Sequence, residues 1–306
     1  EMTLRNELSG GTPVVREFEA RWREWAGLRY SMTVLNGTSA LYSAYFGLGV
    51  GPGDEVICPT YTWICTIAPA VMLGARPVFV ESDPKTLQLD PQDVRRKITD
   101  KTRVIVAVHL WGNVCDMDAL MDISRETGVP VLEDCSHAHG ALYKGRKVGT
   151  FGDAAGFSLM SGKSLPCGEG GIMTTNDRRI YERAIAFGHY ARHNELTLED
   201  LKAGAGLPWG GYKYRMNQLT SAMCRIQLRY YPKLMAEIDK AMNYFWDLLE
   251  GVPGIRSHRP PKDSGTTKGG WYAPHGLYRP EELRGLSIHK FCEAVRAEGV
   301  PCRPGC

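Results

Sequence analysis

Two kinds of hydrophobic pattern alternate along roughly the first 190 residues of the chain. Short runs that are apolar at nearly every position are separated by stretches with apolar residues at helical spacing. Strands that are apolar throughout are buried on both faces, as in parallel sheets covered by helices. The pattern therefore predicts an α/β fold, with a mostly parallel sheet and helices on both faces. The predicted strands are 30–35, a short one within 51–59, 75–81, 102–110, 129–135, 154–160 and 170–176, and the predicted helices are 13–27, 37–50, 91–99, 116–128 and 177–188.

The pattern changes in the last third of the chain. The stretch from about 190 to 214 is rich in glycine and aromatic residues and is predicted as an irregular loop. A long amphipathic helix is expected at 217–251, interrupted at Pro232 because proline breaks the helical hydrogen-bond ladder. A polar segment, a strand in "WYAPHGLY" and a helix at 287–300 follow.

This shift of composition sets the expected domain boundary. We predict a large domain at 1–250 and a smaller α+β domain at 251–306. The chain opens on Glu1 and stops at "RPGC", so we expect the smaller domain to be incomplete.

Composition and charge narrow the class of protein. The net charge of +3, from 37 basic and 34 acidic residues, gives no attraction to nucleic acid or to an anionic membrane. The longest apolar stretch, 61–75, contains Pro69 and is too short to span a bilayer, so it is predicted as a buried helix. The nine cysteines form no CxxC pair and are expected to be free thiols. We therefore expect a cytoplasmic protein without a signal peptide.

Three polar features follow predicted strands, where ligands bind in open α/β sheets. The first is "NGTSA" at 36–40, at the start of a helix. Free amides and the helix dipole attract anions there, and Thr38 and Ser39 offer hydroxyl donors to a phosphate. Ordinary capping of the helix explains the same residues equally well.

The second feature is "VLEDCSHAHG" at 131–140. Asp134 follows a buried apolar run directly, and His137 and His139 come just after it. These residue types suit metal binding, acid–base work or an ion pair to a cofactor nitrogen, whereas a solvated turn is the plain alternative. The position of Asp134 favours a working carboxylate.

The third feature is Lys163 in "GFSLMSGKS" at 156–164. A phosphate-binding loop, G-x-x-x-x-G-K-[ST], requires glycine where this chain has Phe157. The register therefore argues against a nucleotide site. A half-buried lysine between small residues is instead a candidate Schiff-base nucleophile, because burial lowers the pKa of its amine. A surface lysine is the plain alternative.

Together the three features suit one cofactor, pyridoxal 5'-phosphate. It needs an amine for the Schiff base, an anion site for its phosphate and a carboxylate beside its pyridine nitrogen. Trp63, in "PTYTWICT" after another strand, offers an aromatic face for stacking, although core packing would also explain it.

The order of these segments resembles the DegT/StrS-type sugar aminotransferases, which are fold-type-I pyridoxal phosphate enzymes with a seven-stranded sheet. The resemblance runs from about residue 10 to residue 306, and its most specific parts are "EDCSHAHG" and the "FS…K…GEGG" block. It implies that Lys163 forms the Schiff base and moves a proton, and that Asp134 keeps the pyridine nitrogen protonated. His137 matches a residue near the phenolic oxygen, and Trp63 matches the stacking aromatic. The implied phosphate contacts are Thr38, Ser39 and Ser158.

Two positions depart from the family pattern. The family commonly has "GYNYR", whose asparagine reaches the cofactor phosphate of a second subunit, where this chain has Lys213 in "GYKYR". An ammonium group can make the same contact. Met160 stands on the substrate side where the family often has histidine or glutamine, which suggests an unusual acceptor.

The resemblance implies a two-stage transamination. L-Glutamate or L-glutamine would give its amino group, and a nucleotide-linked keto sugar or a keto cyclitol would accept it. Shared active sites imply a homodimer. The alternatives are another pyridoxal phosphate reaction, a non-catalytic sensor on the same fold, a P-loop nucleotidase, and a metal hydrolase using Asp134, His137 and His139, for which no third set of ligands is evident.

Overall fold

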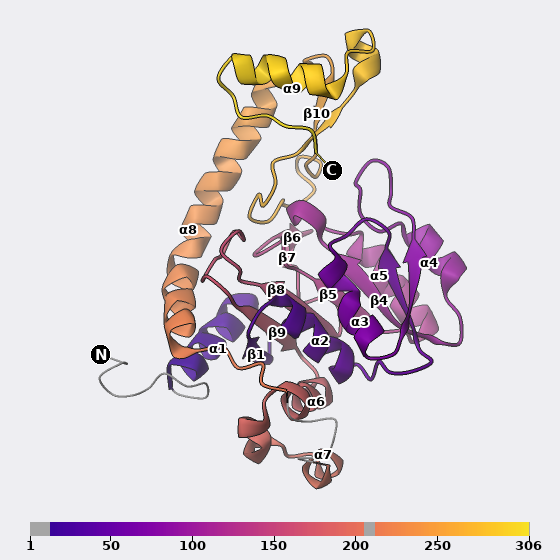
Figure 1. Ribbon diagram of the computed structural model, residues 1–306, viewed down its shortest axis with the longest axis vertical. Coiled ribbons are helices and arrows are strands. Elements are labelled where there is room, and N and C mark those ends of the chain that lie inside the picture. Colours follow the sequence, from indigo (N-terminus) through magenta and orange to yellow (C-terminus); the bar gives the residue numbers. More distant parts are fainter. Residues whose placement is uncertain (1–12, 205–211, 306) are drawn as a thin grey trace.

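The computed structural model describes residues 13–204 and 212–305 and is built on a seven-stranded sheet (Figure 1). The strand order is β1-β9-β8-β5-β4-β2-β3. Neighbouring strands from β8 to β3 pair in parallel, and β9 runs antiparallel to β8 and β1. The prediction of a mostly parallel sheet is confirmed. The strands are β1 (Tyr30–Val34), β2 (Glu55–Pro59), β3 (Arg76–Val80), β4 (Thr102–Val108), β5 (Val131–Asp134), β8 (Ala154–Ser158) and β9 (Gly171–Thr175).

Helices cover both faces of this sheet, as the uniformly apolar strands predicted. Val104 and Val106 of β4 belong to an apolar cluster with α2, α3 and α6, whereas Ile105 belongs to a cluster on the opposite face with α4 and α5. A third cluster joins β8 and β9 to α1 and α8. The helices are α1 (Pro13–Ala26), α2 (Gly37–Gly47), α3 (Ala68–Met72), α4 (Pro91–Lys97), α5 (Met117–Thr127), α6 (Arg178–Gly188) and α8 (Gln218–Leu248).

Short elements connect and extend this layered body. They are the 3-10 helices η1 (Ile64–Thr66), η2 (Leu110–Gly112), η3 (Tyr190–Glu195) and η4 (Pro280–Leu283), the strand pairs β6 (Leu142–Tyr143) with β7 (Arg146–Lys147) and β10 (Ile255–Ser257) with β11 (Gly276–Tyr278), and the helices α7 (Glu199–Ala203) and α9 (Ile288–Ala297). The predicted irregular loop thus contains η3 and α7, and its residues 205–211 lie outside the described part of the chain.

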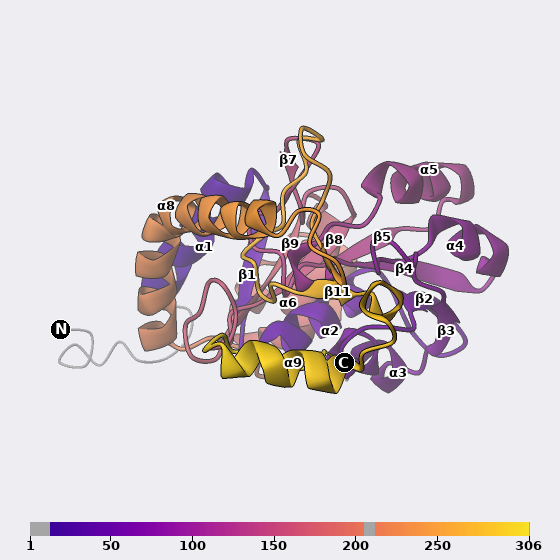
Figure 2. The ribbon, with the colours of Figure 1, turned by 90° about the horizontal axis from the view of Figure 1, so that it is seen from above.

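Two predictions about helices were wrong in detail. The segment 61–75 forms only η1 and α3, because Pro69 begins a new helix after η1 and Gly74, with φ +90°, ends it. Ile64 and Met72 are exposed rather than buried. The helix at 218–248 is continuous through Pro232. Both views show its axis changing direction along its length, so the proline bends the helix without ending it (Figures 1 and 2).

The chain after α8 first leaves the sheet and then returns to it. Elements β10, β11 and α9 lie at the far end of α8 (Figure 1), whereas the segment 258–275 packs against the large body. The N–H of Gly269 donates to the carbonyl of Gly112 at 2.9 Å, and the N–H of Thr267 donates to that of Leu142 at 2.9 Å. The division into 1–250 and 251–306 stays a prediction. Within the described ranges, none of the helices combines the length and the apolar character needed to cross a bilayer.

Lys268 is the buried lysine of this returning segment, with 1% of its surface exposed. Its Nζ donates to the carbonyl of His258 at 2.9 Å and lies 5.2 Å from the ring centroid of Trp271. Burial lowers the pKa of Lys268 to about 7, from an ordinary 10.5. Docking of 258–275 therefore favours the neutral amine.

We expect Lys268→Met to stabilise the protein at pH 7 by about 2–4 kcal/mol, even though the hydrogen bond to His258 is lost. Between pH 7 and 10.5 the unfolded chain binds a proton that the folded lysine does not, so the stability of the natural protein rises by about 1.4 kcal/mol per pH unit. The advantage of the variant should shrink as pH rises. Urea unfolding at pH 7, 8 and 9 measures this, and a difference that does not change with pH would contradict it.

Candidate active site

A cavity with a volume of about 670 Å³ lies at the carboxyl ends of the parallel strands. Its walls come from the segments that follow β1, β2, β4, β5 and β8, which meet there because these strands run in one direction. Six of the eight residues predicted for the site line it: Thr38, Trp63, Asp134, His137, Ser158 and Lys163. Ser39 and Lys213 do not.

Asp134 is a buried carboxylate held by two donors. The hydroxyl of Thr66 donates to Oδ2 at 2.8 Å, and the N–H of Ser136 donates to Oδ1 at 3.1 Å. Thr66 is itself fixed by two contacts. The hydroxyl of Tyr45 donates to the backbone carbonyl of Thr66 at 2.7 Å, and the hydroxyl oxygens of Thr62 and Thr66 lie 2.8 Å apart. The carboxylate therefore keeps one orientation toward the cavity.

Lys163 is half-buried and brings an amine into the same cavity. Its backbone N–H donates to the carbonyl of Met160 at 2.9 Å, and its Nζ lies 4.4 Å from the ring centroid of Tyr272. Burial lowers the pKa of Lys163, while the charges of Asp134 and Cys65 act in the opposite direction. A lysine of lowered pKa supplies more of the neutral amine, which is the nucleophilic form.

His137 presents a proton donor beside this amine. Burial, followed by the positive charge of Lys163, lowers the pKa of His137 to about 3, so the ring is neutral at ordinary pH. The N–H of Trp111 donates to Nδ1 at 3.3 Å, which places the ring proton on Nε2. The ring also stacks on Tyr272, with centroids 3.9 Å apart and planes at 14°. Nε2 is thus the donor left for a ligand oxygen.

The first turn of α2 forms an anion cradle in the same cavity. Gly37, Thr38 and Ser158 line the cavity there. A Cβ on Gly37 would lie 2.6 Å from the Cβ of Ser158, so glycine is needed for this close approach. Amide groups of the helix start and two hydroxyls therefore converge, which is an arrangement that binds phosphate. Ser39 is buried behind them, where its N–H and hydroxyl both donate to Asn36 Oδ1 at 2.9 and 3.0 Å.

The remaining predicted residues lie at the edge of the site. Trp63 lines the cavity but keeps 69% of its surface exposed, which leaves its indole face available for stacking. Lys213 is exposed outside the cavity, with its Nζ 5.9 Å from the ring centroid of Tyr190. The cofactor contacts of Ser39, Trp63 and Lys213 stay predictions.

A metal site built on Asp134, His137 and His139 is not supported. His139 is buried beneath the cavity, where its Nε2 lies 2.8 Å from the carbonyl of Ser158 and its Nδ1 3.2 Å from the hydroxyl of Ser164. Both of its nitrogens are therefore engaged, and the imidazole does not face Asp134 as a ligand.

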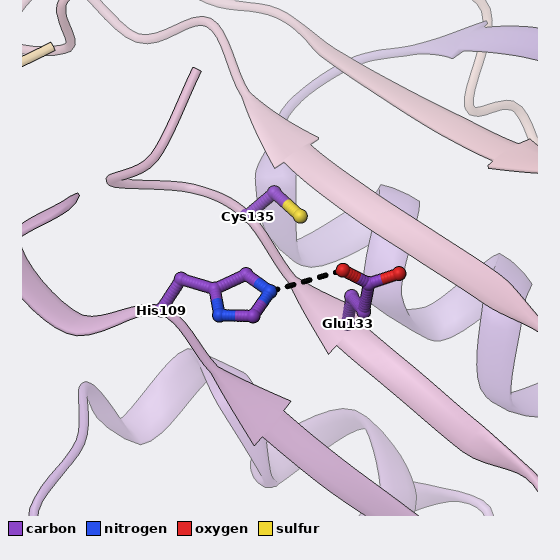
Figure 3. Close-up of side chains that lie close together, drawn as sticks. All are labelled: His109, Glu133 and Cys135. Atoms are coloured by element: carbon purple, nitrogen blue, oxygen red, sulfur yellow. Dashed lines mark hydrogen bonds and ion pairs between the residues drawn. The ribbon is translucent and has the colours of Figure 1, made fainter. Parts of the chain in front are cut away.

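A second group with metal-binding residue types lies deeper in the core. The donor atoms of His109, Glu133 and Cys135 are all within 4.8 Å of one another, and His109 Nε2 lies 3.0 Å from Glu133 Oε2 (Figure 3). The other nitrogen of His109, Nδ1, accepts the N–H of Cys115 at 3.2 Å. The histidine therefore has no lone pair left for a metal.

The carboxylate oxygens of Glu133, like the nitrogens of His109, are occupied by hydrogen bonds. Burial opposes its charge, but hydrogen bonds from His109 and from backbone N–H groups hold its pKa below its ordinary value. The cluster is thus a hydrogen-bonded support that ties the loop after β7 to β5, directly beside Asp134. The backbone donors to Glu133 are Gly149 at 2.7 Å, Phe151 at 2.8 Å and Gly152 at 2.7 Å.

The structure also argues against a phosphate-binding loop for nucleotides, and the argument again concerns Phe157. Phe157 is a buried residue of strand β8, and its ring packs edge-on against Trp22 with centroids 5.0 Å apart. A phosphate-binding loop would require a glycine there, in a loop rather than a strand.

Sequence reasoning missed Tyr272 and Thr66. Thr66 stands three residues after Trp63, and nothing in its local pattern links it to Asp134. Tyr272 follows the pair Gly269–Gly270 at the end of the predicted polar segment, and two adjacent glycines before an aromatic pair are a signal of close backbone packing.

Comparison with known proteins places this arrangement in a family. A sequence model of the DegT/DnrJ/EryC1/StrS aminotransferase family matches residues 2–304. The chain belongs to this family. The predicted resemblance, the fold and the aminotransferase class are confirmed. Members of this family are pyridoxal 5'-phosphate enzymes, so the predicted cofactor is confirmed as well.

Relatives in the family carry names of sugar and cyclitol enzymes. The chain is 37% identical over 287 residues to a putative L-glutamine:3-amino-2,3-dideoxy-scyllo-inosose aminotransferase of Streptoalloteichus tenebrarius, covering 93% of this chain and 67% of that protein. It is 39% identical over 216 residues to GDP-perosamine synthase of Escherichia coli O157:H7, covering 70% of this chain and 57% of that protein. The match thus spans little more than half of the latter enzyme.

Solved structures of similar chains have the same fold as this chain. An aminotransferase from Psychrobacter cryohalolentis is 31% identical, with a TM-score of 0.88 over 99% of this chain and 80% of that one. The 3-amino-5-hydroxybenzoic acid synthase is 32% identical, with a TM-score of 0.82 over 95% of this chain and 73% of that one.

The polar groups that line the cavity match the functional groups of pyridoxal 5'-phosphate. One wall supplies the amine of Lys163, a second supplies the fixed carboxylate of Asp134, and the N-terminus of α2 supplies the anion cradle. The Nε2 proton of His137 suits a phenolate oxygen. Each functional group of pyridoxal phosphate therefore finds a partner of matching chemistry.

Proposed function

We propose that this chain catalyses pyridoxal phosphate-dependent transfer of an amino group from L-glutamate or L-glutamine to a keto sugar or a keto cyclitol. The observation that carries the proposal is the meeting of Lys163, Asp134 and the anion cradle in one cavity. The family supports the reaction type, and the names of the relatives support the substrate class.

The cofactor supplies an aldehyde that bonds to amines and a ring that stores the electron pair released when a Cα–H bond breaks. The chain supplies everything else. Lys163 is the amine that anchors the aldehyde, and once free it moves the proton from the donor's Cα. Asp134, oriented by Thr66 and Ser136, holds the proton on the pyridine nitrogen. His137, whose Nδ1 accepts the N–H of Trp111, would donate from Nε2 to the phenolic oxygen.

The donor and acceptor are proposed from relatives. L-Glutamine stands in the names of two inosose-type relatives that cover 93% and 97% of this chain at 37% and 32% identity. Relatives named for GDP-perosamine and for a dTDP-amino sugar support a nucleotide-linked keto sugar. Met160 lines the cavity, and a methionine makes the acceptor side less polar than a histidine or glutamine would. A non-catalytic sensor is a weaker proposal because Lys163 and Asp134 are both in place.

The experiment that tests the function follows the visible absorption of the protein loaded with pyridoxal phosphate. L-Glutamate and L-glutamine are added separately, and the keto product of each is assayed. We expect one donor to bleach the band and to release its keto acid in one-to-one amount. A band that neither donor bleaches would overturn the aminotransferase proposal. A panel of keto cyclitols and nucleotide-linked keto sugars then identifies the acceptor by recovery of the band.

A homodimer is part of the proposal, and an exposed apolar stripe along α8 supports it. Its residues recur every three or four positions and therefore lie on one face of the helix. A second copy of the chain is proposed to cover this stripe and to bring Lys213 near its neighbour's cradle. The stripe consists of Leu219, Met223, Ile226, Tyr230 and Leu234.

We expect the pair of changes Ile226→Asp and Tyr230→Asp to convert a dimer into a monomer, because each places a charge inside an apolar interface. Sedimentation velocity at micromolar concentration measures the change. Ala236→Asp is the matched control, since Ala236 is exposed on the same helix but stands two positions after Leu234 and so lies on another face. A natural protein that sediments as a monomer, or a double variant that stays dimeric, would contradict the stripe as the interface.

We also propose a cytoplasmic location. The cysteines of the described ranges are unpaired, and Cys58, Cys115 and Cys135 are buried in the core, where a reducing compartment preserves them as thiols.

A further inference from the structure

Tyr272 reaches the catalytic cavity from the returning segment 258–275, far along the chain from the other site residues. It lines the cavity, and its ring meets two of the groups that do the chemistry. The imidazole of His137 stacks on it at a centroid distance of 3.9 Å, and the Nζ of Lys163 lies 4.4 Å from its centroid. The ring therefore touches both the proton donor and the amine.

The turn before Tyr272 is built for close packing rather than for flexibility. Gly269 approaches so closely that a Cβ would lie 2.8 Å from the N of Ala141, and a Cβ on Gly270 would lie 2.2 Å from the Oγ of Ser164. On Gly112, a Cβ would lie 2.1 Å from the carbonyl oxygen of Gly269. The backbone at 269–270 thus rests directly on the segments that follow His137 and Lys163.

The backbone conformation and a hydrogen bond complete this turn. Gly270 has φ +65°, and Trp271 has φ +45°, a region that a tryptophan rarely adopts. The indole of Trp271 donates to Asp239 Oδ1 of α8 at 2.9 Å. The surrounding contacts hold an unfavourable backbone conformation in place, and its effect is to direct Tyr272 into the cavity.

We propose that the ring of Tyr272 is a resting place for Lys163 in its protonated form, and that it holds this ammonium group beside the reacting atoms after the lysine has taken up the donor's Cα proton. The inference rests on the proposed aminotransferase function, in which the lysine is released and must act again at the same place. A lysine has a long flexible stem, and an aromatic face attracts its ammonium form. The stack on His137 keeps the face of Tyr272 from turning away. Tyr272 is thus a positioning residue.

The test compares Tyr272→Phe, which keeps the ring, with Tyr272→Leu, which keeps an apolar side chain but has no aromatic face. The first readout is the pKa of Lys163 in cofactor-free protein, from competitive acetylation at several pH values and peptide mass spectrometry. We expect the natural protein and Tyr272→Phe to agree, and Tyr272→Leu to give a pKa about 0.4 to 1.5 pH units lower. The groups that face this amine, Asp134, His137 and Cys65, are unchanged in both variants.

The second readout is kinetic. In the loaded enzyme, Tyr272→Leu should lower kcat about 5- to 20-fold and leave the KM of the amino donor within twofold, whereas Tyr272→Phe should match the natural protein. Exposed Lys233 serves as the internal reference for acetylation. An unchanged pKa of Lys163 in Tyr272→Leu, or equal losses in both variants, would overturn the proposal. The labelling needs no activity, so a shifted pKa in a protein that transfers no amino group would overturn the proposed function alone.

Discussion

Lys163→Ala is expected to remove the visible absorption band of the bound cofactor and to lower the rate of amino transfer by about 10⁴-fold or more. The loss is large because one amine performs two tasks, covalent anchoring and proton movement at Cα, and general acid–base catalysis by a placed group alone contributes about 10²- to 10⁴-fold. Absorption spectra and single-turnover kinetics with the amino donor measure the two effects separately.

Two further variants make this result specific. Lys163→Arg keeps a positive charge but offers no neutral amine, so it should be as inactive as Lys163→Ala. Lys147→Ala is the matched control, because Lys147 is another half-buried lysine whose pKa is lowered by burial and which lies outside the cavity. A band and a rate in Lys163→Ala that equal those of the natural protein would remove Lys163 from the proposed role.

Asp134→Asn is expected to lower kcat by about 10²- to 10³-fold, which corresponds to about 3–4 kcal/mol in the barrier. The amide keeps the size of the side chain and can still accept the Thr66 hydroxyl, but it carries no negative charge to hold a proton on the ring nitrogen. The electron pair released at Cα is then stored less well, because the ring is no longer cationic.

Thr66→Val provides the graded comparison. It leaves the charge of Asp134 and removes one of its two donors, so we expect a loss of only about 3- to 10-fold, in line with the net contribution of one ordinary hydrogen bond, about 0.5–1.5 kcal/mol. Steady-state kinetics of both variants, with thermal unfolding to confirm the fold, measure the difference. Equal losses in Asp134→Asn and Thr66→Val would show that geometry matters and charge does not.

The sequence alone predicted the layered α/β body and most of the cavity for a physical reason. Strands that are buried on both faces are uniformly apolar, and a polar residue that ends such a run must lie at the sheet edge. Asp134 at the end of β5, Ser158 at the end of β8 and Thr38 after β1 follow this rule, and all three line the cavity.

The parts that could not be predicted depend on contacts between distant segments. Tyr272 and Thr66 carry no local signal of their partners, since Thr66 donates to Asp134 and Tyr272 stacks on His137 across long stretches of chain. Ser39 illustrates a second limit, in which a local pattern is visible but is compatible with two different roles. The pattern "NGTSA" is compatible both with capping and with anion binding, and its hydroxyl proved to be engaged with Asn36 in the cap.

The glycine turn at 269–270 also sets an order of assembly. Its contacts are with Gly112, Ala141 and Ser164, and these residues and all seven strands of the sheet precede the turn in the chain, so they are made first during synthesis. The sheet and the anion cradle can therefore form while the cavity is still open above Lys163. The amine becomes shielded only when this turn docks, so a newly made chain passes through a stage in which aldehydes other than the cofactor have free access to it.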